Sequence, residues 1–301
     1  MSPPSLHRPV ITRTAHAKVN LALAVGPPRE DDGFHPIASW MACIDLADEL
    51  ELTRLEEDYL SRYAIIWHED ARRKTPIDWS ITKDLAVRAH LLMEQEAQQA
   101  LPVQLKLEKR IPVGGGLGGG SADAAAMLLA TRELFELDIP NERLAELASR
   151  LGSDVPYFLG EGPAIVEGLG ERIERTDPVG GALVLVIPEF GCPTGDVYRA
   201  FDAAHPGPLR DADVRTMATA GSLDASRLFN DLCDAAIGVR PDLDGLMDQV
   251  EACSDDLPVH LTGSGSTLFL VCPQGRRHAR KLAERIEQHV DAVAAIAVNL
   301  V

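Results

Sequence analysis

The sequence is short of basic residues and has no long apolar run. It carries 29 Lys and Arg against 46 Asp and Glu, a formal net charge of −17. Such an acidic surface repels phosphate backbones and anionic headgroups, so general binding to nucleic acid or to an anionic membrane is not expected. No apolar run approaches the roughly 18 residues that predict a membrane-spanning helix. An anionic substrate would therefore need a local electropositive pocket.

Cysteine and metal-ligand patterns are also sparse. The five cysteines are scattered, with no CxxC pair, and the nine histidines show no HExxH spacing. This pattern favours reduced thiols in the cytoplasm over a disulfide framework or a zinc site. Residues 1–14 are rich in Pro and Ser and lack the apolar core of a signal peptide, so a frayed leader is expected there.

At about 100–200 residues per domain, 301 residues suggest two domains, and we place them at 1–163 and 164–301. Helical and alternating patterns mix without regular βαβ succession, which favours an α+β fold. A polar loop is expected at 205–222. Strands are predicted at 15–25, 34–46, 48–55, 63–68, 103–110, 163–168, 182–188, 258–262, 267–272 and 293–299, and helices at 80–100, 121–135, 141–150, 194–203, 224–237, 241–252 and 275–290.

One segment, residues 112–126 (PVGGGLGGGSADAAA), holds six glycines between a predicted strand and a predicted helix. Six glycines cost considerable backbone entropy on folding, and a structural turn needs only one or two. They do permit close approach of a ligand to several inward-turned N–H groups. The helix that Ser121 then opens carries partial positive charge at its N-terminus. The segment therefore predicts an anion site suited to a triphosphate.

Other interpretations of this loop fit less well. No Gly-Lys-Ser/Thr ending follows the glycines, so it is not a Walker A loop. A dinucleotide fingerprint can be aligned as Gly114-x-Gly116-x-x-Gly119, but the preceding strand is amphipathic and no acidic residue ends a convincing strand about 20 residues on. A flexible linker would not lie tightly between a strand and an alanine-rich helix.

The loop resembles the phosphate loop of the GHMP kinases, since GLGGGS is preceded by Ile-Pro and followed by two alanines. Four further segments resemble motifs of one branch of that family. They are residues 17–21 (AKVNL), 32–35 (DGFH), 152–156 (GSDVP) and 261–266 (LTGSGS). Their occurrence together and in this order is far more specific than any one of them.

The resemblance implies a two-domain α+β fold, in which a ribosomal protein S5 domain 2-like N-terminal domain and a ferredoxin-like C-terminal domain enclose ATP and substrate in a cleft. ATP and Mg²⁺ would be the cofactors. Lys109 either reaches the adenosine or is a solvated strand lysine, and Ser121 either approaches Mg²⁺ or caps the helix. The residues implied for ATP binding are Lys109, Pro112, Gly114, Gly115, Gly116, Leu117, Gly118, Gly119, Gly120 and Ser121.

The resemblance assigns catalysis to Asp154 and Lys18. Phosphoryl transfer needs positioning, charge stabilisation and a base for the hydroxyl proton. Asp154 would be that base, and a neighbouring lysine would keep its carboxylate ionised. Without the resemblance, Asp154 would be read as a turn or helix-capping residue, and Lys18 as a snorkelling surface lysine.

The same branch phosphorylates the 2-hydroxyl of a cytidine diphosphate ester of methylerythritol, in non-mevalonate isoprenoid synthesis. By resemblance, the substrate would contact Asn20, Phe34, His35, Thr194 and Tyr198, with two aromatic rings around the cytosine. The alternative for the two aromatic residues is core packing.

The chain departs from the family pattern at three places. Phe34 stands for the usual Tyr, Asp84 for an Asn near the adenine, and Asp123 ends a Ser-Ala-Asp run where Ser-Ser-Asn is usual. The alternatives to the cytidine-ester kinase are another GHMP kinase, of homoserine or mevalonate type, and a non-catalytic nucleotide-binding protein on the same fold. Retention of Asp154 and Lys18 argues against the last. A monomer or homodimer is expected.

Overall fold

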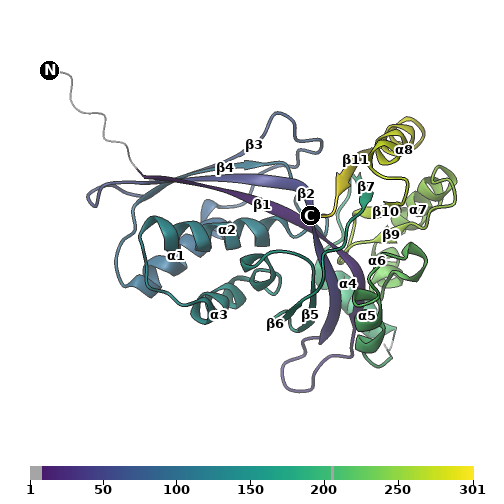
Figure 1. The fold of residues 1–301 in the computed structure, drawn as a ribbon, viewed down its shortest axis with the longest axis horizontal. Helices are drawn as coiled ribbons and strands as arrows, with labels where there is room; N and C mark the ends of the chain where they lie inside the picture. The colour runs from purple at the N-terminus through teal and green to yellow at the C-terminus, as the bar shows by residue number, and fades with distance from the viewer. Residues whose placement is uncertain (1–8, 205–206) are drawn as a thin grey trace.

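The structure, a computed structural model, describes residues 9–204 and 207–301 (Figure 1). Within these ranges it has α-helices, strands and three short 3-10 helices. In chain order they are β1 (Val10–Val25), β2 (Ile37–Arg54), β3 (Arg62–Trp67), η1 (Ile81–Lys83), α1 (Leu85–Ala97), β4 (Val103–Lys109), α2 (Gly119–Leu134), α3 (Asn141–Leu151), η2 (Pro156–Leu159), β5 (Ala164–Gly168), β6 (Arg172–Arg175), β7 (Ala182–Pro188), α4 (Thr194–Ala203), α5 (Asp211–Ala218), η3 (Ala225–Arg227), β8 (Phe229–Asn230), α6 (Cys233–Val239), α7 (Asp242–Ala252), β9 (His260–Leu261), β10 (Leu268–Cys272), α8 (Arg276–His289) and β11 (Val293–Asn299).

Two long strands, β1 and β2, run through both halves of the molecule (Figure 1). They pair antiparallel from Val10↔Thr53 to Val25↔Ile37 and form a hairpin with a long loop. The strands predicted at 34–46 and 48–55 are one strand, β2. Residues 10–14 were expected to fray, but they belong to β1 because the far end of β2 supplies their hydrogen-bonding partners. The rest of the expected leader, residues 1–8, lies outside the described residues.

The first sheet has the order β3-β4-β2-β1-β8, with β5 and β6 added beside β2. Helices α1 and α2 cover one face of it (Figure 1), and their apolar residues share a core with alternate residues of β4. The first turns of α2 are rich in buried alanine, including Ala122, Ala124 and Ala125. Such small side chains let the helix carrying the glycine loop lie close to the sheet.

The second sheet is antiparallel, in the order β11-β7-β10-β9. Its inner face packs against β1 and β2 through a core that includes Val19 and Leu21 from β1, and Leu185 and Phe269 from β7 and β10. A second core, on the other face of this sheet, contains residues of α4, α6, α7 and α8. The two sheets are thus joined by buried apolar side chains, and the α+β prediction is confirmed.

Three expectations from the sequence differ from the structure. Residues 164–175 form β5 and β6 in the first sheet, so the predicted boundary after residue 163 does not coincide with the change of sheet. The expected loop at 205–222 contains helix α5, which buries Val214 and Met217; residues 205–206 of that loop are not described. The helix predicted at 224–237 is broken into η3, β8 and α6 because β8 pairs with β1.

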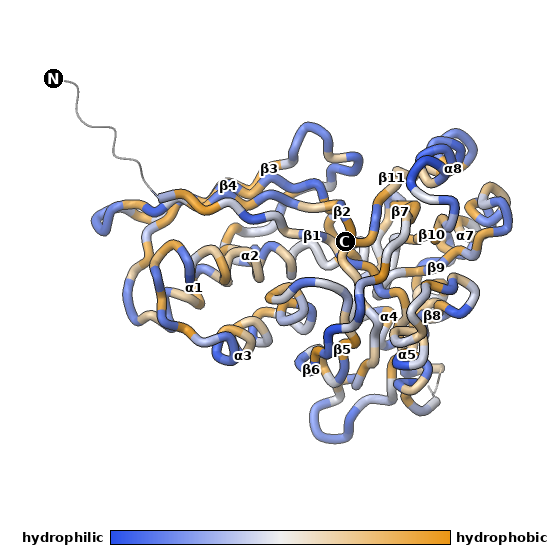
Figure 2. Tube along the Cα trace, in the orientation of Figure 1, coloured by the Kyte–Doolittle hydropathy of each residue, from blue (hydrophilic) through white to orange (hydrophobic). Residues whose placement is uncertain are grey.

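Hydropathy along the chain follows this architecture. Figure 2 shows apolar colour along much of the strands and polar colour over most of α8. Among the described residues, no helix combines the length and apolarity needed to cross a membrane.

Candidate active site

Lys18 and Asn20 lie in the part of β1 where its pairing with β2 is irregular. The register shifts between His16 and Lys18, and again between Asn20 and Ala22. Such bulges re-aim side chains and are common beside active sites. Lys18 Nζ donates to Asn20 Oδ1 at 2.6 Å, so the two side chains share a face, as residues two apart in a strand do. Lys18 is only 3% exposed, which excludes the snorkelling alternative.

The glycine loop is attached to the protein through its carbonyl groups. Lys18 donates to Gly116 O from Nζ and to Leu117 O from its backbone N–H, both at 2.9 Å. The N–H of Thr267 donates to Gly115 O at 3.3 Å. In the part of the chain that the structure describes, no N–H group of residues 113–121 donates to a protein acceptor. These N–H groups are therefore available to an anion, as a phosphate loop requires.

Gly116 and Gly118 are required for two reasons. Both have positive φ, +77° and +70°. A Cβ on Gly116 would lie 2.3 Å from Thr262 O, and one on Gly118 would lie 3.0 Å from both Lys18 Cγ and Phe158 Cζ. Any larger residue would be strained and would push the loop away from its neighbours.

Helix α2 begins directly after this loop, at Gly119, with Gly118 at the N-cap and no side-chain cap. Its first N–H groups therefore extend the row of free donors, and its dipole adds positive potential. Ser121 is inside the helix, so the capping alternative is wrong, while its approach to Mg²⁺ stays a prediction. Pro112 and Leu117 are buried and support the loop from its protein side.

A second glycine-containing loop, residues 262–266, lies beside the first. Thr262 Oγ1 accepts from the N–H of Asn20 at 3.0 Å and lies 3.3 Å from Asn20 Oδ1. Ser264 Oγ lies 2.9 Å from Thr194 Oγ1. The sequence singled out this loop but not the individual roles of Thr262 and Ser264. Those contacts depend on tertiary neighbours more than 60 residues away, for which the local pattern holds no signal.

Asp154 lies in the turn before η2, with its side chain 28% exposed and Oδ2 3.7 Å from Lys18 Nζ. It does not cap η2. The turn between β5 and β6 supports this segment closely, since a Cβ on Gly170 would lie 2.2 Å from Ser153 O. Burial lowers the pKa of Lys18, and the nearby Asp154 carboxylate opposes that shift. The Asp154 carboxylate thus favours the charged form of the buried lysine.

Lys109 is not a solvated lysine, since it is only 3% exposed. Its side chain is buried, and Nζ donates to Asp48 Oδ2 and Asp123 Oδ2. Lys109 is thus buried between two carboxylates, and its predicted ATP contact stays a prediction. The sequence held a signal for this, because Lys109 shares the buried phase of β4 with Val103, Leu105 and Leu107.

His35 joins the loop after β1 to helix α4. Its Nδ1 lies 2.9 Å from Gly26 O, and since a carbonyl only accepts, Nδ1 carries a hydrogen. Its Nε2 lies 3.3 Å from Asp202 Oδ1. The ring is 5.0 Å from the Tyr198 ring, centroid to centroid. Burial first, and the charge of Asp154 second, raise the pKa of Tyr198 to about 12. Tyr198 is thus within electrostatic reach of the catalytic candidate.

The remaining predicted substrate residues are more exposed. Phe34 is 62% exposed, so it is not part of the core and its ring face is free to stack. Thr194 is the first residue of α4 and is held by Ser264. His35 and Tyr198 therefore lie together, and Tyr198 is within electrostatic reach of Asp154. Thr194 is attached to the second glycine loop, and Phe34 is exposed to solvent.

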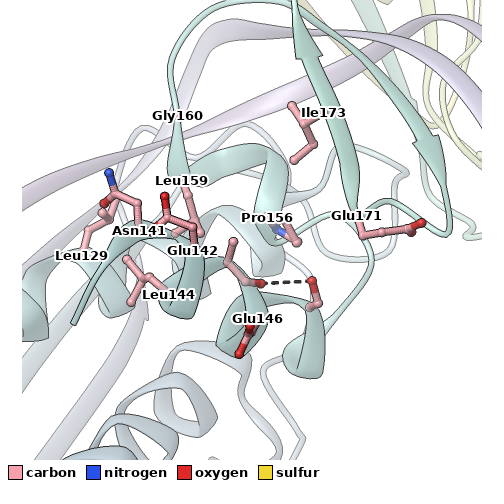
Figure 3. A pocket seen from close by; sticks show the side chains of 12 residues that line it. Leu129, Asn141, Glu142, Leu144, Glu146, Pro156, Leu159, Gly160, Glu171 and Ile173 are labelled. Carbon is pink, nitrogen blue, oxygen red and sulfur yellow. Dashed lines mark hydrogen bonds between the residues drawn. The ribbon is translucent and has the colours of Figure 1, made fainter.

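A cavity of about 440 Å³ lies elsewhere, between α3, η2 and β6 (Figure 3). Its lining includes Pro156 and Leu159 but none of the candidate site residues.

Comparison with known proteins agrees with this geometry. Residues 84–162 match the family described as "GHMP kinases N terminal domain". A homoserine kinase from Cytophaga hutchinsonii superposes with a TM-score of 0.69 over 98% of this chain and 95% of its own, at 16% identity, which shows a shared fold. The fold and the glycine loop together define a GHMP kinase.

The more similar relatives narrow this class. A 4-diphosphocytidyl-2-C-methyl-D-erythritol kinase from Bacillus cereus (strain B4264) is 36% identical over 88% of this chain and 89% of its own. One from Symbiobacterium thermophilum is 36% identical over 90% and 93%. A crystal structure of a 4-(cytidine 5'-diphospho)-2C-methyl-D-erythritol kinase superposes with a TM-score of 0.77 at 34% identity, over 96% of this chain and 99% of that one. The chain belongs to the 4-diphosphocytidyl-2-C-methyl-D-erythritol kinase family.

Proposed function

We propose that the chain transfers the γ-phosphoryl group of ATP to the 2-hydroxyl of 4-diphosphocytidyl-2-C-methyl-D-erythritol, a step of non-mevalonate isoprenoid precursor synthesis. The observation that carries the proposal is the Lys18–Asp154 pair. Lys18 Nζ donates to Gly116 O of the glycine loop, and the charge of Asp154 acts on Tyr198, whose ring lies 5.0 Å from the His35 ring. The names of the similar relatives support the substrate. The five unpaired cysteines support a reducing, cytoplasmic setting.

The chemistry follows from the positions of these groups. Asp154 accepts the proton of the attacking hydroxyl while the hydroxyl oxygen of the substrate bonds to the γ-phosphorus, and ADP leaves. Lys18 stabilises the negative charge that develops between the base and the phosphate, and it also holds Gly116 O. The free N–H groups of residues 113–121 hold the phosphates.

Mg²⁺ belongs to the same proposal. The free N–H row fits a polyphosphate, and a divalent ion commonly enters kinases bound mainly to substrate phosphates, with few protein ligands. Ser121, in the first turn of α2, is the side chain that would approach it. When bound, the ion neutralises charge on the phosphates.

The cytidine end of the substrate is assigned to His35, Tyr198 and Thr194. Phe34 is the exposed ring that would stack on the base. A stacked base contributes about 1–3 kcal/mol by analogy with single-stranded nucleic acids. Because His35 Nδ1 donates to Gly26 O, the ring is held in one orientation, with Asp202 at its other nitrogen.

The test is ADP release with a panel of alcohols: the cytidine ester, homoserine and mevalonate. The proposal expects turnover with the cytidine ester alone. Turnover with homoserine or mevalonate at a similar kcat/KM would replace it by another GHMP activity, and ATP binding without turnover of any alcohol would indicate a non-catalytic protein. His35→Ala should raise KM for the cytidine ester about 5- to 150-fold and leave KM for ATP nearly unchanged, because a lost hydrogen bond to a buried group costs about 1–3 kcal/mol.

A further inference from the structure

One buried ammonium connects the two ends of the glycine loop. Lys109 is the last residue of β4, and Asp123 lies in the second turn of α2, so the whole loop lies between them in the chain. Lys109 Nζ is 2.5 Å from Asp123 Oδ2 and 2.5 Å from Asp48 Oδ2. All three side chains are almost fully buried. We call Lys109, Asp48 and Asp123 the loop clamp.

Asp48 extends the loop clamp to the backbone at the loop entrance. Its Oδ1 accepts from the N–H of Arg110 and, at 2.8 Å, from that of Ile111, the two residues that leave β4. One carboxylate of β2 therefore fixes the direction in which the chain enters the loop. Hydrogen bonds to a buried carboxylate are short and strong, so this direction is well defined.

The composition of the loop clamp is costly for folding. Two carboxylates share one ammonium, and in the described residues Asp123 Oδ1 has no hydrogen-bond partner. Burial, together with the charges of Asp48 and Asp84, raises the pKa of Asp123 to about 8 against the opposing effect of Lys109. Buried ionic groups of this kind are poor contributors to stability compared with apolar packing. Their position behind the loop indicates a different role.

The loop itself needs such support. Among the described residues its N–H groups have no protein partners, and its carbonyls are held at only a few points. The separation of the end of β4 from the start of α2 decides whether these N–H groups converge on one point. Convergent, preorganised donors bind an anion well because little further ordering is needed on binding.

We propose that Lys109 is a positioning residue that donates to Asp48 and Asp123 at once, holds the two ends of the phosphate loop together, and so sets the affinity for ATP. The proposal rests on the ATP site of the proposed function. What it requires at position 123 is an acceptor oxygen of the right reach, whether or not that oxygen is charged.

Two substitutions at position 123 separate these requirements. Asp123→Asn keeps the shape and an acceptor oxygen for Lys109. Asp123→Leu keeps a similar volume and removes the acceptor. Binding of the ATP analogue AMP-PNP with Mg²⁺, measured by calorimetry, should be within about threefold of the parent for Asp123→Asn and about tenfold or more weaker for Asp123→Leu. With Asp123→Leu, KM for ATP should rise in step, while kcat at saturating ATP stays within about threefold.

A general loss of stability is the competing explanation. Met93→Ala, in the buried face of α1, serves as the matched control because it opens a cavity in the same core away from the loop. The proposal expects Met93→Ala to lower the melting temperature without weakening AMP-PNP binding. If Asp123→Leu does not fold, Lys109→Met with Asp123→Leu removes both partners and should show the same weakened binding.

Either of two results would overturn the loop clamp: AMP-PNP binding by the folded Leu variant within twofold of the parent, or equal weakening by Met93→Ala. These outcomes are distinguishable from failure of the proposed function, in which the parent itself would bind no AMP-PNP or phosphorylate no alcohol.

Discussion

Lys18 Nζ lies 3.7 Å from Asp154 Oδ2 and at the same time donates to the carbonyl of Gly116. One buried ammonium therefore contacts both the candidate base and the phosphate loop. The two residues are 136 positions apart in the chain (154 minus 18). They meet where β1 packs against the start of α2, since Gly118 lies beside both Lys18 and Phe158 of η2. This contact is the basis of the first two predictions.

Asp154→Asn keeps the shape of the side chain but removes its ability to accept a proton. We expect kcat to fall about 10²- to 10⁴-fold, because general-base assistance is lost. KM for ATP should change little, since among the described residues no hydrogen bond or ion pair joins Asp154 to the loop. Steady-state kinetics with ATP varied at saturating alcohol will measure both, and normal turnover would mean that Asp154 is only a turn residue.

Lys18→Met should affect both parameters. It removes the cation beside Asp154 and the donor to Gly116 O, so we expect kcat to fall about 10²- to 10³-fold and KM for ATP to rise. Lys106→Met is the control, because Lys106 is an exposed lysine of β4 paired with Glu108. Comparable losses in both variants would show a general charge effect and contradict the assigned role.

Gly118→Ala tests the loop geometry. The added Cβ would meet Lys18 and Phe158 at 3.0 Å in a backbone of positive φ, so the loop must move. We expect KM for ATP to rise about tenfold or more while KM for the alcohol changes less. Gly245→Ala in α7 is the matched control, since its Cβ has open space and alanine favours a helix by about 0.5–1 kcal/mol. Unchanged ATP kinetics in a folded Gly118→Ala protein would argue against this loop as the phosphate site.

The burial of His260, at the start of β9, leads us to expect a loss of stability in acid. Burial lowers the pKa of His260 to about 4 from its ordinary 6.5, and its ring packs against Phe269. The unfolded chain therefore binds the proton more tightly than the folded chain. The stability that comes from burying the neutral His260 ring is present above pH 6.5 and is lost as the pH falls toward 4. The loss is about 1.4 kcal/mol per pH unit at most, or roughly 3 kcal/mol in all.

Urea unfolding between pH 7.5 and 4.5 measures this effect. His260→Gln should show a shallower decline in the free energy of unfolding than the parent over that range. Parallel declines in the two proteins would mean that His260 does not carry the pH dependence.

Much of the site followed from the sequence, and the limits have physical causes. The strand predicted at 15–25 lies within β1, and the glycine run placed the anion loop between a strand and a helix. The pairing of Lys18 with Asp154 came from the motifs together, because no local pattern relates residues so far apart. Their meeting is confirmed by the structure.

The missed elements depend on long-range contacts or on weak local signals. β8 is two residues long and exists because Phe229 and Asn230 pair with β1, so its sequence favours helix until that partner is known. α5 is eight residues between Pro- and Gly-rich segments, too short for a clear apolar period. Lys109 is buried because Asp48 and Asp123 surround it, and a lysine in an alternating strand would otherwise be expected in water.

The most direct test of the central claim compares two alcohols in the parent enzyme. One is the cytidine diphosphate ester of methylerythritol, and the other is methylerythritol phosphate, which lacks the cytidine. Binding energy from a distant part of a substrate is used to position the reacting hydroxyl, so its loss lowers kcat/KM. At about 1–3 kcal/mol for the stacked base, and further for its hydrogen bonds, we predict a kcat/KM at least about 100-fold higher for the cytidine ester. Equal values for the two alcohols would contradict the assignment of His35 and Tyr198 to a cytidine site.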